Sequence, residues 1–281
     1  MPKKVVTTIN GRLVTDSQAK ISVYDNSLLY AEGLFETYMA VGEHIAFPKE
    51  HFERMQKGGN FVGIKIPVSK KHLGEWLTKT AKKHPAKIKR LRVTITSGES
   101  SVWQVKAGQP QVIISAVEHK FDNRPLRIYA PELRIDADSS FNHIKSIAYG
   151  IRAAALRRAQ RKGFEDALLL NNKNQVSEIT SANIFWVEKN RIYTPPLSAG
   201  CLEGVTRRVI IEQARKQNWS IREKNCTMHV LAKADEVFTT SSVRLARPVG
   251  EIKSADFQAE IKQGDKWETI FNHLCRMLDI K

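Results

Sequence analysis

The sequence predicts a mixed α/β protein built of two lobes. Its 281 residues are enough for one large domain or two medium ones, and a hydrophobic content of 42% supplies the side chains for real cores. Segments that favour strands and segments that favour helices alternate along both halves. The polar stretch HKFDNRP, residues 119–125, has the composition of a linker. We therefore expect an N-terminal lobe over residues 1–120 and a C-terminal lobe over residues 121–281.

Two hairpins, two helices and two further strands are expected in the N-terminal lobe. VVTTINGRLVT places Asn-Gly between two β-rich runs, and LFETYMAVGEHIAF repeats this arrangement around Gly42. Pro48 should begin a helix through EHFERMQKGGNFVG that its glycines stop, and Ser69 should begin another. RLRVTITS and QVIISAVE have the β-branched composition of strands.

The C-terminal lobe should begin with a strand near 126–130, followed by a helix over about 147–162. The apolar face of this helix consists of residues at helical spacing, namely Ile147, Ile151, Ala154, Ala155 and Ala159. Its solvated face would carry the arginines Arg152, Arg157, Arg158 and Arg161.

Short strands and helices should complete this lobe. DALLLNNKNQVSEITSANIFWVEKNRIYT contains short apolar runs separated by polar turns, which is typical of strands. GVTRRVIIEQARKQ is expected to be helical and DEVFTTS to be a strand. An amphipathic helix should close the chain near 266–279.

The net charge of +16 raises nucleic acid as a partner, because a basic face binds phosphates without sequence preference. Basic clusters occur at residues 82–92 and 152–163, but the second falls on the polar face of the expected helix. No signature of a nucleic-acid-binding fold accompanies them. We expect no nucleic-acid partner and favour small anionic molecules.

Membrane, secretory and metal-binding classes find no support in the sequence. No stretch approaches the ~20 apolar residues of a membrane span, and MPKKVVTTINGRLV lacks the apolar core of a signal peptide. We expect a cytoplasmic protein without a membrane partner. The cysteines Cys201, Cys226 and Cys275 are odd in number and have no CxxC spacing, so neither a disulfide framework nor a metal site is indicated.

Lys145 lies in the segment FNHIKSIAYG, residues 141–150, among the apolar side chains of Ile144, Ile147 and Ala148. Burying an ammonium group without a partner costs several kcal/mol. A lysine stem can also lie on apolar surface while its head reaches solvent. Taken alone, the segment favours that second, unremarkable interpretation.

Six segments together carry a resemblance to a known family. They are YDNSLLYAEGLFETYM, HFERM, HIKSIAY, GFEDALLLNNKNQVSEITSANIFWV, LSAGCLEGVTR and DEVFTTSSVRLARPV. In this order and at these separations they resemble the class IV, or fold type IV, pyridoxal-phosphate enzymes. That family includes branched-chain aminotransferases, D-amino acid aminotransferases and 4-amino-4-deoxychorismate lyases. The resemblance covers nearly the whole chain. It implies a smaller N-terminal α/β lobe and a larger C-terminal pseudo-barrel lobe, which would carry the catalytic lysine and most cofactor contacts.

The resemblance implies the cofactor pyridoxal 5'-phosphate. It also implies a role at the cofactor for four residues of this chain. Lys145 matches the lysine that holds the cofactor covalently, and its amine would then move the substrate's proton. Glu178 matches the glutamate that faces the pyridine nitrogen and keeps the ring protonated. Tyr149 resembles the tyrosine at the phenolic oxygen, although a core tyrosine is the alternative. Asn183 matches an asparagine that supports the pocket.

The cofactor phosphate has its own implied ligands. Arg54 in HFERM matches the family's phosphate arginine, whose planar group binds two oxygens at once. GVTRR opens a helix, so the N–H groups of Val205 and Thr206, with the Thr206 hydroxyl, can point at an anion. In TTSSVRL, Ser242 and Val243 fall where relatives have phosphate-contacting residues.

Departures from the family pattern bear on the reaction. Tyr30 is followed by Ala-Glu-Gly where relatives often have Gly-Asp/Glu-Gly. In TITSGESSVWQVK, residues 94–106, Ser97 precedes Gly98 and no arginine or histidine follows to bind a substrate carboxylate. Met39 stands where FETxR relatives have arginine. The branched-chain loop is also missing. Arg244 and Arg247 remain as basic residues that either receive a carboxylate or face solvent.

The pattern comes closest to the lyase branch, through TPPLSAGCLEGVTR. Aminodeoxychorismate lyase, which makes 4-aminobenzoate and pyruvate for folate biosynthesis, is therefore the first expectation. A class IV aminotransferase of D-amino acids or branched-chain amino acids is the alternative. The partners expected are a small-molecule amino substrate and a second copy of the chain in a homodimer. AVGEHIAF and YDNSLLY are the candidate dimer contacts.

Overall fold

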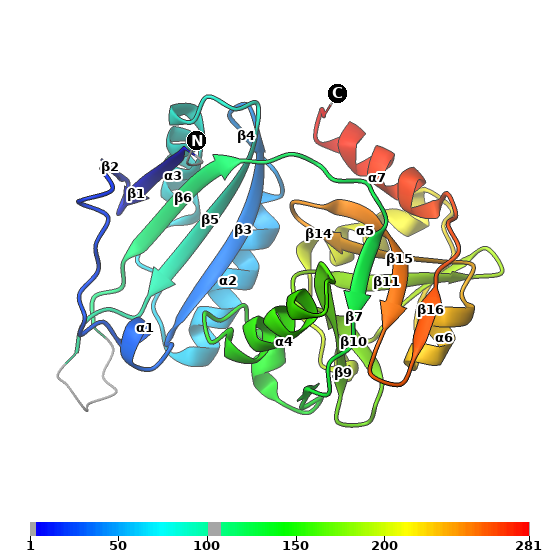
Figure 1. Ribbon diagram of the computed structural model, residues 1–281. Helices are drawn as coiled ribbons and strands as arrows, with labels where there is room; N and C mark the ends of the chain where they lie inside the picture. Colours follow the sequence, from blue (N-terminus) through cyan, green and yellow to red (C-terminus); the bar gives the residue numbers. More distant parts are fainter. Residues whose placement is uncertain (1–3, 101–107, 281) are drawn as a thin grey trace. The chain divides into compact units, whose positions relative to one another are not determined.

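The chain divides into two compact units (Figure 1). The computed structural model describes residues 4–100 and 108–280. The first unit comprises Met1–Lys120 and Ile144–Ala148, and the second comprises Phe121–His143 and Tyr149–Lys281. The segment with Lys145 thus belongs to the first unit, whereas the sequence led us to expect it in the C-terminal lobe. The reason is a pair of backbone hydrogen bonds to a strand of the first unit, described below.

The first unit is built on an antiparallel sheet. Within the described residues its strands lie in the order β2-β1-β6-β5-β3-β4. These strands are β1 (Val5–Ile9), β2 (Arg12–Val14), β3 (Gly33–Val41), β4 (His44–Ile45), β5 (Ile88–Thr96) and β6 (Val112–Glu118). Asn10 and Gly11 take φ values of 50° and 76°, as a two-residue hairpin turn requires, and Gly42 has a φ of 60°. Both predicted hairpins are therefore present.

Helices α1 (Asn26–Leu29), α2 (Pro48–Val62) and α3 (Lys70–Lys83) belong to this unit, and α2 and α3 pack against the sheet (Figure 1). Helix α2 begins at Pro48 as predicted but continues through Gly58 and Gly59. It ends at Gly63, whose φ of 74° is left-handed. A Cβ at Gly59 would lie 2.6 Å from the carbonyl oxygen of Ile64. This glycine therefore allows a close approach and does not stop the helix.

The second unit is built on a larger sheet that curls into a half-barrel. Its strands lie in the order β10-β9-β7-β15-β14-β11-β12-β13, with β8 beside β9 and β16 beside β15, within the described part of the chain. These strands are β7 (Leu126–Tyr129), β8 (Arg134–Ile135), β9 (Asp166–Asn171), β10 (Val176–Ile179), β11 (Asn183–Glu188), β12 (Arg191–Thr194), β13 (Ile221–Glu223), β14 (Glu236–Ser241), β15 (Leu245–Lys253) and β16 (Gln258–Glu260). Strand β7 runs parallel to both β9 and β15, while β14 is antiparallel to β11 and β15.

One helix of the second unit, α4 (Gly150–Arg161), differs from its prediction in where it begins and in which residues it buries. The helices of this unit are α4, α5 (Val205–Lys216), α6 (Met228–Lys233) and α7 (Lys266–Met277), with 3-10 turns at Ser140–His143 and Leu197–Ala199. Helix α4 begins three residues later than expected, because Ile147 is held by a backbone hydrogen bond to Gly33. Ile151, assigned to its apolar face, is 57% exposed. Arg152, assigned to its solvated face, is partly buried.

Candidate active site

Lys145 is held against strand β3 through its backbone. The Phe35 N–H donates to the Lys145 carbonyl at 2.9 Å, and the Ile147 N–H donates to the Gly33 carbonyl at 3.1 Å. A Cβ at Gly33 would lie 2.7 Å from both Ile147 Cδ1 and the carbonyl oxygen of Ile95, so this position needs glycine. Lys145 Nζ lies 4.5 Å from the centre of the Phe35 ring. The ammonium group is thus directed at an aromatic face, which attracts cations.

Arg54, the predicted phosphate arginine, forms part of a buried polar cluster in the first unit. Its Nε lies 2.8 Å from Glu36 Oε1 and its Nη2 lies 2.6 Å from Glu36 Oε2. His51 Nδ1 lies 2.7 Å from Glu36 Oε2. The Glu36 and His51 side chains are fully buried, and that of Arg54 is 10% exposed. Strand β3 thereby holds the guanidinium of helix α2 in one orientation.

Charge sets the protonation of this cluster. Burial alone would raise the pKa of Glu36, but Arg54 and His51 outweigh it and lower the pKa from 4.5 to about 2. Burial also lowers the pKa of His51, and the Glu36 charge opposes this only in part. Glu36 is therefore ionised at neutral pH, and a neutral His51 donates its Nδ1–H to it.

Acid should destabilise the protein through this cluster. A carboxylate whose pKa is depressed in the folded state stabilises that state above its unfolded pKa, and this is lost as pH falls toward the folded value. For Glu36 the window runs from about pH 4.5 to about pH 2 and corresponds to ~3 kcal/mol at most. His51 acts in the same direction from about pH 6.5 downward. A Glu36→Gln/His51→Gln double variant, in which neither position titrates, should be less stable at pH 7 and should lose less stability between pH 5 and pH 3.

The measurement is the free energy of unfolding of the cofactor-free protein from denaturant titrations at pH 7, 5 and 3. Glu43→Gln is the matched control, because the Glu43 side chain is 53% exposed and its ion pair with Lys82 lies at the surface. Equal acid sensitivity of wild type and the Glu36→Gln/His51→Gln double variant would contradict the prediction.

Glu178 lies on β10 in the second unit, where its side chain is 5% exposed and ion-paired. Arg152 donates to Glu178 Oε1 from Nη2 at 2.6 Å and from Nε at 3.2 Å, and the Leu202 N–H donates to Oε2 at 3.2 Å. Tyr149, the residue before helix α4, donates its hydroxyl to the carbonyl of Thr180. Glu178 and Tyr149 are thus brought close together by one short strand and the turn that follows it.

Asn183 supports the loop that leads into helix α5. Its Nδ2 donates to the Leu202 carbonyl at 2.8 Å. Gly204 is the residue before the helix, and a Cβ there would collide with Asn183 Oδ1. The glycine and the asparagine therefore bring the loop into close contact with the start of β11.

A phosphate group fits the start of helix α5. The first N–H groups of a helix have no intrahelical acceptors, and the helix dipole there attracts anions. Val205 and Thr206 are the first two residues of α5 and are 3% and 1% exposed. Within the described residues, Thr206 Oγ1 is buried without a hydrogen-bond partner. This hydroxyl needs an acceptor or donor that a bound phosphate would supply.

Ser242 and Val243 form the turn between β14 and β15, and both are partly buried. Strand β14 pairs with β11 so that Thr240 lies opposite Asn183. The turn therefore follows the end of β14 that lies beside the start of β11. The predicted contacts Asn183, Thr206 and Ser242 accordingly come from neighbouring parts of one unit.

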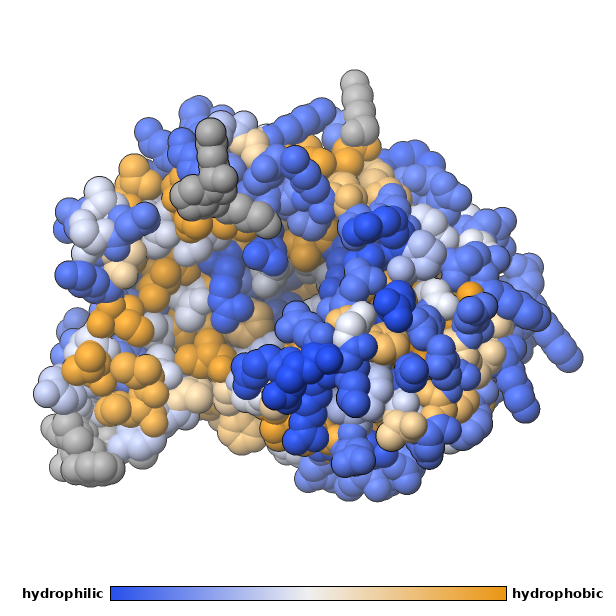
Figure 2. Space-filling model, in the orientation of Figure 1, coloured by the Kyte–Doolittle hydropathy of each residue, from blue (hydrophilic) through white to orange (hydrophobic). Residues whose placement is uncertain are grey.

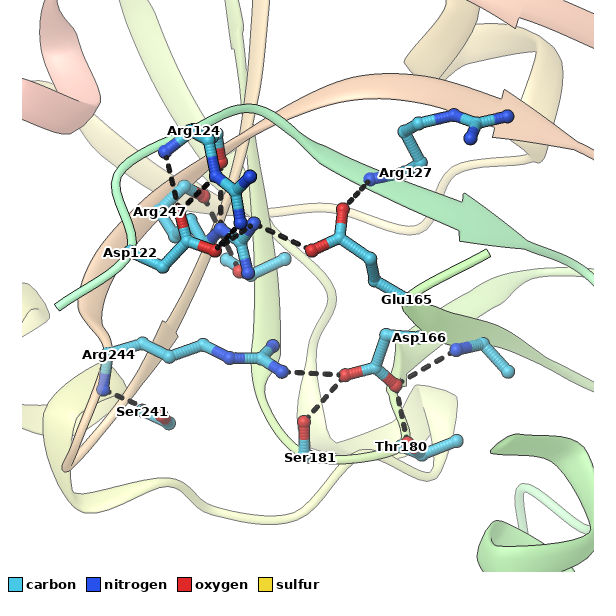
Figure 3. Close-up of polar contacts among 12 residues, drawn as sticks. Asp122, Arg124, Arg127, Glu165, Asp166, Thr180, Ser181, Ser241, Arg244 and Arg247 are labelled. Carbon is cyan, nitrogen blue, oxygen red and sulfur yellow. Dashed lines mark hydrogen bonds and ion pairs between the residues drawn. The ribbon is translucent and has the colours of Figure 1, made fainter. Parts of the chain in front are cut away.

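Arg244 and Arg247 are both engaged in ion pairs rather than exposed (Figure 3). Arg244 Nη2 lies 2.9 Å from Asp166 Oδ2, and Asp166 also accepts from the hydroxyls of Thr180 and Ser181. Arg247 Nη2 lies 2.8 Å from Glu165 Oε1. Arg247 thus links β15 to the residue before β9. Of the two alternatives that the sequence left open for Arg247, facing solvent is therefore wrong.

The departures from the family pattern at Met39 and Ser97 lie at buried positions. Ser97 follows β5, is 1% exposed, and donates its N–H to Ser27 Oγ at 3.0 Å. Gly98 has a φ of 83°, and Met39 on β3 is fully buried. The expected absence of a carboxylate-binding arginine or histidine concerns a stretch that runs into residues 101–107, which lie outside the described residues.

Sequence reasoning missed three residues that support the predicted ligands of the cofactor. Glu36 binds Arg54, His51 in turn binds Glu36, and Arg152 binds Glu178. Glu36 and His51 carry a signal, since both lie inside the motifs FETYM and HFERM. For Arg152 the signal was misleading, because the helical pattern assigned it to solvent.

Metal and thiol chemistry have no visible site in residues 4–100 and 108–280. No group of three histidine, cysteine, aspartate or glutamate side chains there is arranged to hold a metal ion. All three cysteines are buried and free. Burial and, secondarily, the Glu178 charge raise the pKa of Cys201 to about 12, so this thiol is protonated at neutral pH. Nor does any helix in these ranges combine the length and apolar character needed to cross a bilayer.

Comparisons with known proteins relate the whole chain to one family. The family model for amino-transferase class IV matches residues 33–252. A protein of Methanocaldococcus jannaschii that is provisionally named a branched-chain-amino-acid aminotransferase is 30% identical over 87% of this chain and 86% of its own length. The aminodeoxychorismate lyase of Bacillus subtilis is 29% identical over 90% and 88%. The crystal structure of a branched-chain aminotransferase from Thermoproteus uzoniensis with norvaline is similar at a TM-score of 0.89 and 25% identity, covering 98% of this chain and 95% of that one.

Proposed function

Because this chain belongs to the class IV aminotransferases, a family of pyridoxal-phosphate-dependent enzymes, we propose that it is a 4-amino-4-deoxychorismate lyase. The reaction would convert aminodeoxychorismate to 4-aminobenzoate and pyruvate. Membership of the family carries the enzyme class and the cofactor. The choice of reaction depends on residues that this chain does not share with relatives of other specificity.

The cofactor contacts that we propose follow from the residues described above. Bound pyridoxal phosphate supplies an electron sink for the pair of electrons left when a proton departs from the substrate's α-carbon. Lys145 would hold the cofactor covalently, and its amine would take up and return that proton. Glu178 would keep the ring nitrogen protonated, and Tyr149 would contact the phenolic oxygen.

The phosphate ligands in this proposal are Arg54, the N–H groups of Val205 and Thr206, and the turn of Ser242 and Val243. The buried Thr206 hydroxyl without a partner among the described residues is the strongest support for this part. Asn183 would act indirectly, by fixing the loop at Leu202. Arg54 would be oriented by Glu36, which His51 holds in place, before the phosphate arrives, so little side-chain entropy is lost on binding.

One observation carries the choice of the lyase. By the family resemblance, Met39 stands where other branches have an arginine that binds the substrate carboxylate, and no arginine or histidine follows Ser97-Gly98 to bind it. Met39 and Ser97 are both buried. A substrate that depends on those contacts would lose them here. The run TPPLSAGCLEGVTR adds support for the lyase branch.

A branched-chain aminotransferase is the second candidate function. It is favoured by the similarity to the Methanocaldococcus jannaschii relative and to the Thermoproteus uzoniensis structure. Lyase and aminotransferase would share every cofactor contact described above and differ only in the fate of the substrate after proton removal. Changes in a few loop residues can redirect specificity within one fold.

One enzyme preparation should be offered aminodeoxychorismate and, separately, L-leucine, L-glutamate and D-alanine with 2-oxo acids. The proposal predicts release of 4-aminobenzoate and pyruvate without an amino acceptor. Efficient conversion of the cofactor to its pyridoxamine form by L-leucine, with no 4-aminobenzoate from aminodeoxychorismate, would contradict the lyase and support the aminotransferase.

We also propose that the protein acts as a homodimer. Hydrophobic side chains are exposed together over and beside helix α1, and Figure 2 shows this patch at its lower left. The patch includes Val23, Tyr24, Leu28, Leu29 and Tyr30, of which Leu28 is 61% exposed. Exposed apolar patches of this kind mark protein contacts. An active monomer in sedimentation at working concentration would contradict the dimer.

A further inference from the structure

Arg152 is the least exposed of the basic residues on helix α4, and it has a specific partner. Its side chain is 21% exposed, and both Nε and Nη2 lie within 3.2 Å of Glu178 Oε1. The guanidinium also lies 5.9 Å from the centre of the Tyr149 ring. Arg152 therefore contacts two of the residues proposed to bind the cofactor, although it was expected to face solvent.

Other arginines of the same helix provide a direct comparison. Arg157, Arg158 and Arg161 lie on α4 and are exposed. An exposed arginine on a solvated face contributes little to stability or to a distant site. The partial burial and the two contacts of Arg152 thus distinguish it from its neighbours on the helix.

The geometry also leaves the carboxylate of Glu178 able to bind something else. Arg152 binds only Oε1, and Oε2 accepts one hydrogen bond from the Leu202 N–H. An ionised carboxylate offers about four acceptor positions, so these three hydrogen bonds do not exhaust its capacity. They do restrict its rotation, because each oxygen is held by a different part of the unit.

We infer that Arg152 is a positioning residue that balances the buried charge of Glu178 and fixes its orientation for the ring nitrogen of the cofactor. This inference rests on the proposed role of Glu178. A carboxylate this deeply buried is disfavoured in its charged form unless a cation is near. Arginine suits that task, because it stays protonated in proteins and donates in a fixed plane. Burial opposes the charge of Arg152, but Glu178 raises the arginine's pKa overall.

The first test uses cofactor-free protein and the variants Arg152→Gln, Arg152→Lys, Arg157→Gln, Glu178→Gln and the double variant Arg152→Gln/Glu178→Gln. Melting temperatures are measured at pH 7. Arg152→Gln leaves the buried carboxylate of Glu178 without its cation, so its melting temperature should fall below that of wild type. The loss in the double variant should be smaller than the sum of the two single losses, because the two residues form one pair. Arg157→Gln should match wild type.

The second test measures kcat of the cofactor-loaded variants on whichever substrate the wild type turns over. Arg152→Gln should lower kcat by about 10- to 100-fold, the range found when the residue supporting an essential ligand is removed. Arg152→Lys should recover part of this loss, since it restores the charge. The double variant should be no slower than Glu178→Gln, because the two residues act as one unit.

The outcomes separate this inference from the function that it rests on. Wild-type kcat in Arg152→Gln, together with slow turnover in Glu178→Gln, would overturn the inference and leave the role of Glu178 intact. Multiplied losses in the double variant would also overturn it. Wild-type turnover in Glu178→Gln would instead overturn the proposed role of Glu178, and the inference with it.

Discussion

Replacing Lys145 with alanine is expected to abolish covalent attachment of the cofactor and to lower turnover by about 10²–10⁴-fold or more, the range for a positioned acid–base group. Two functions would be lost together, since one amine both holds the cofactor and moves the proton. The backbone of residue 145 pairs with β3 through its carbonyl, so truncation of the side chain leaves that contact in place. The variant should therefore fold and still bind pyridoxal phosphate, but without a covalent bond.

Borohydride reduction followed by peptide mapping measures the attachment directly. In wild type the pyridoxyl group should be found on Lys145, and in Lys145→Ala no lysine should carry it. Lys162→Ala is the control, because Lys162 directly follows helix α4 and is exposed. Labelling at another lysine of the wild type would show that the assignment of Lys145 is wrong.

Replacing Glu178 with glutamine is expected to keep the cofactor bound while slowing turnover by about 10²–10³-fold, the loss typical when one charge-stabilising group is removed from an active site. An amide has nearly the shape of the carboxylate, and the Leu202 N–H can still find an oxygen acceptor. It cannot keep the ring nitrogen protonated, so the electron sink is weakened. The change also leaves Arg152 without its anion, which should lower stability.

The absorption spectrum measures how much cofactor is bound. The rate constant under single-turnover conditions measures the chemical step. Glu212→Gln is the control, because Glu212 lies on helix α5 with a side chain that is 63% exposed. Loss of the cofactor with an unchanged rate in the remaining holoenzyme would indicate that Glu178 only stabilises the pocket.

Local sequence signals predicted the elements whose turns and caps have distinctive chemistry. Asn10-Gly11 formed its hairpin turn, Pro48 began α2, and Ser69 caps α3 by accepting from the His72 N–H. Strand β15 escaped prediction, since it contains Pro248, which usually argues against a central strand. The register of β15 against β7 shifts just after Val249, so the sheet accommodates the proline beside an irregularity.

The sequence by itself determined the family and the cofactor, because short motifs in a fixed order are typical of one family. It also predicted Lys145, Glu178 and Arg54 as ligands of that cofactor. Only the tertiary structure decided which residues support them. Arg152 and Glu178 are 26 positions apart in the sequence, and Glu36 and Arg54 are 18 positions apart. Helical periodicity shows which residues share one face of a helix. It does not show which residues of a distant strand pack against that face. For the same reason the sequence assigned Lys145 to the second lobe, whereas two hydrogen bonds to β3 hold its segment in the first unit.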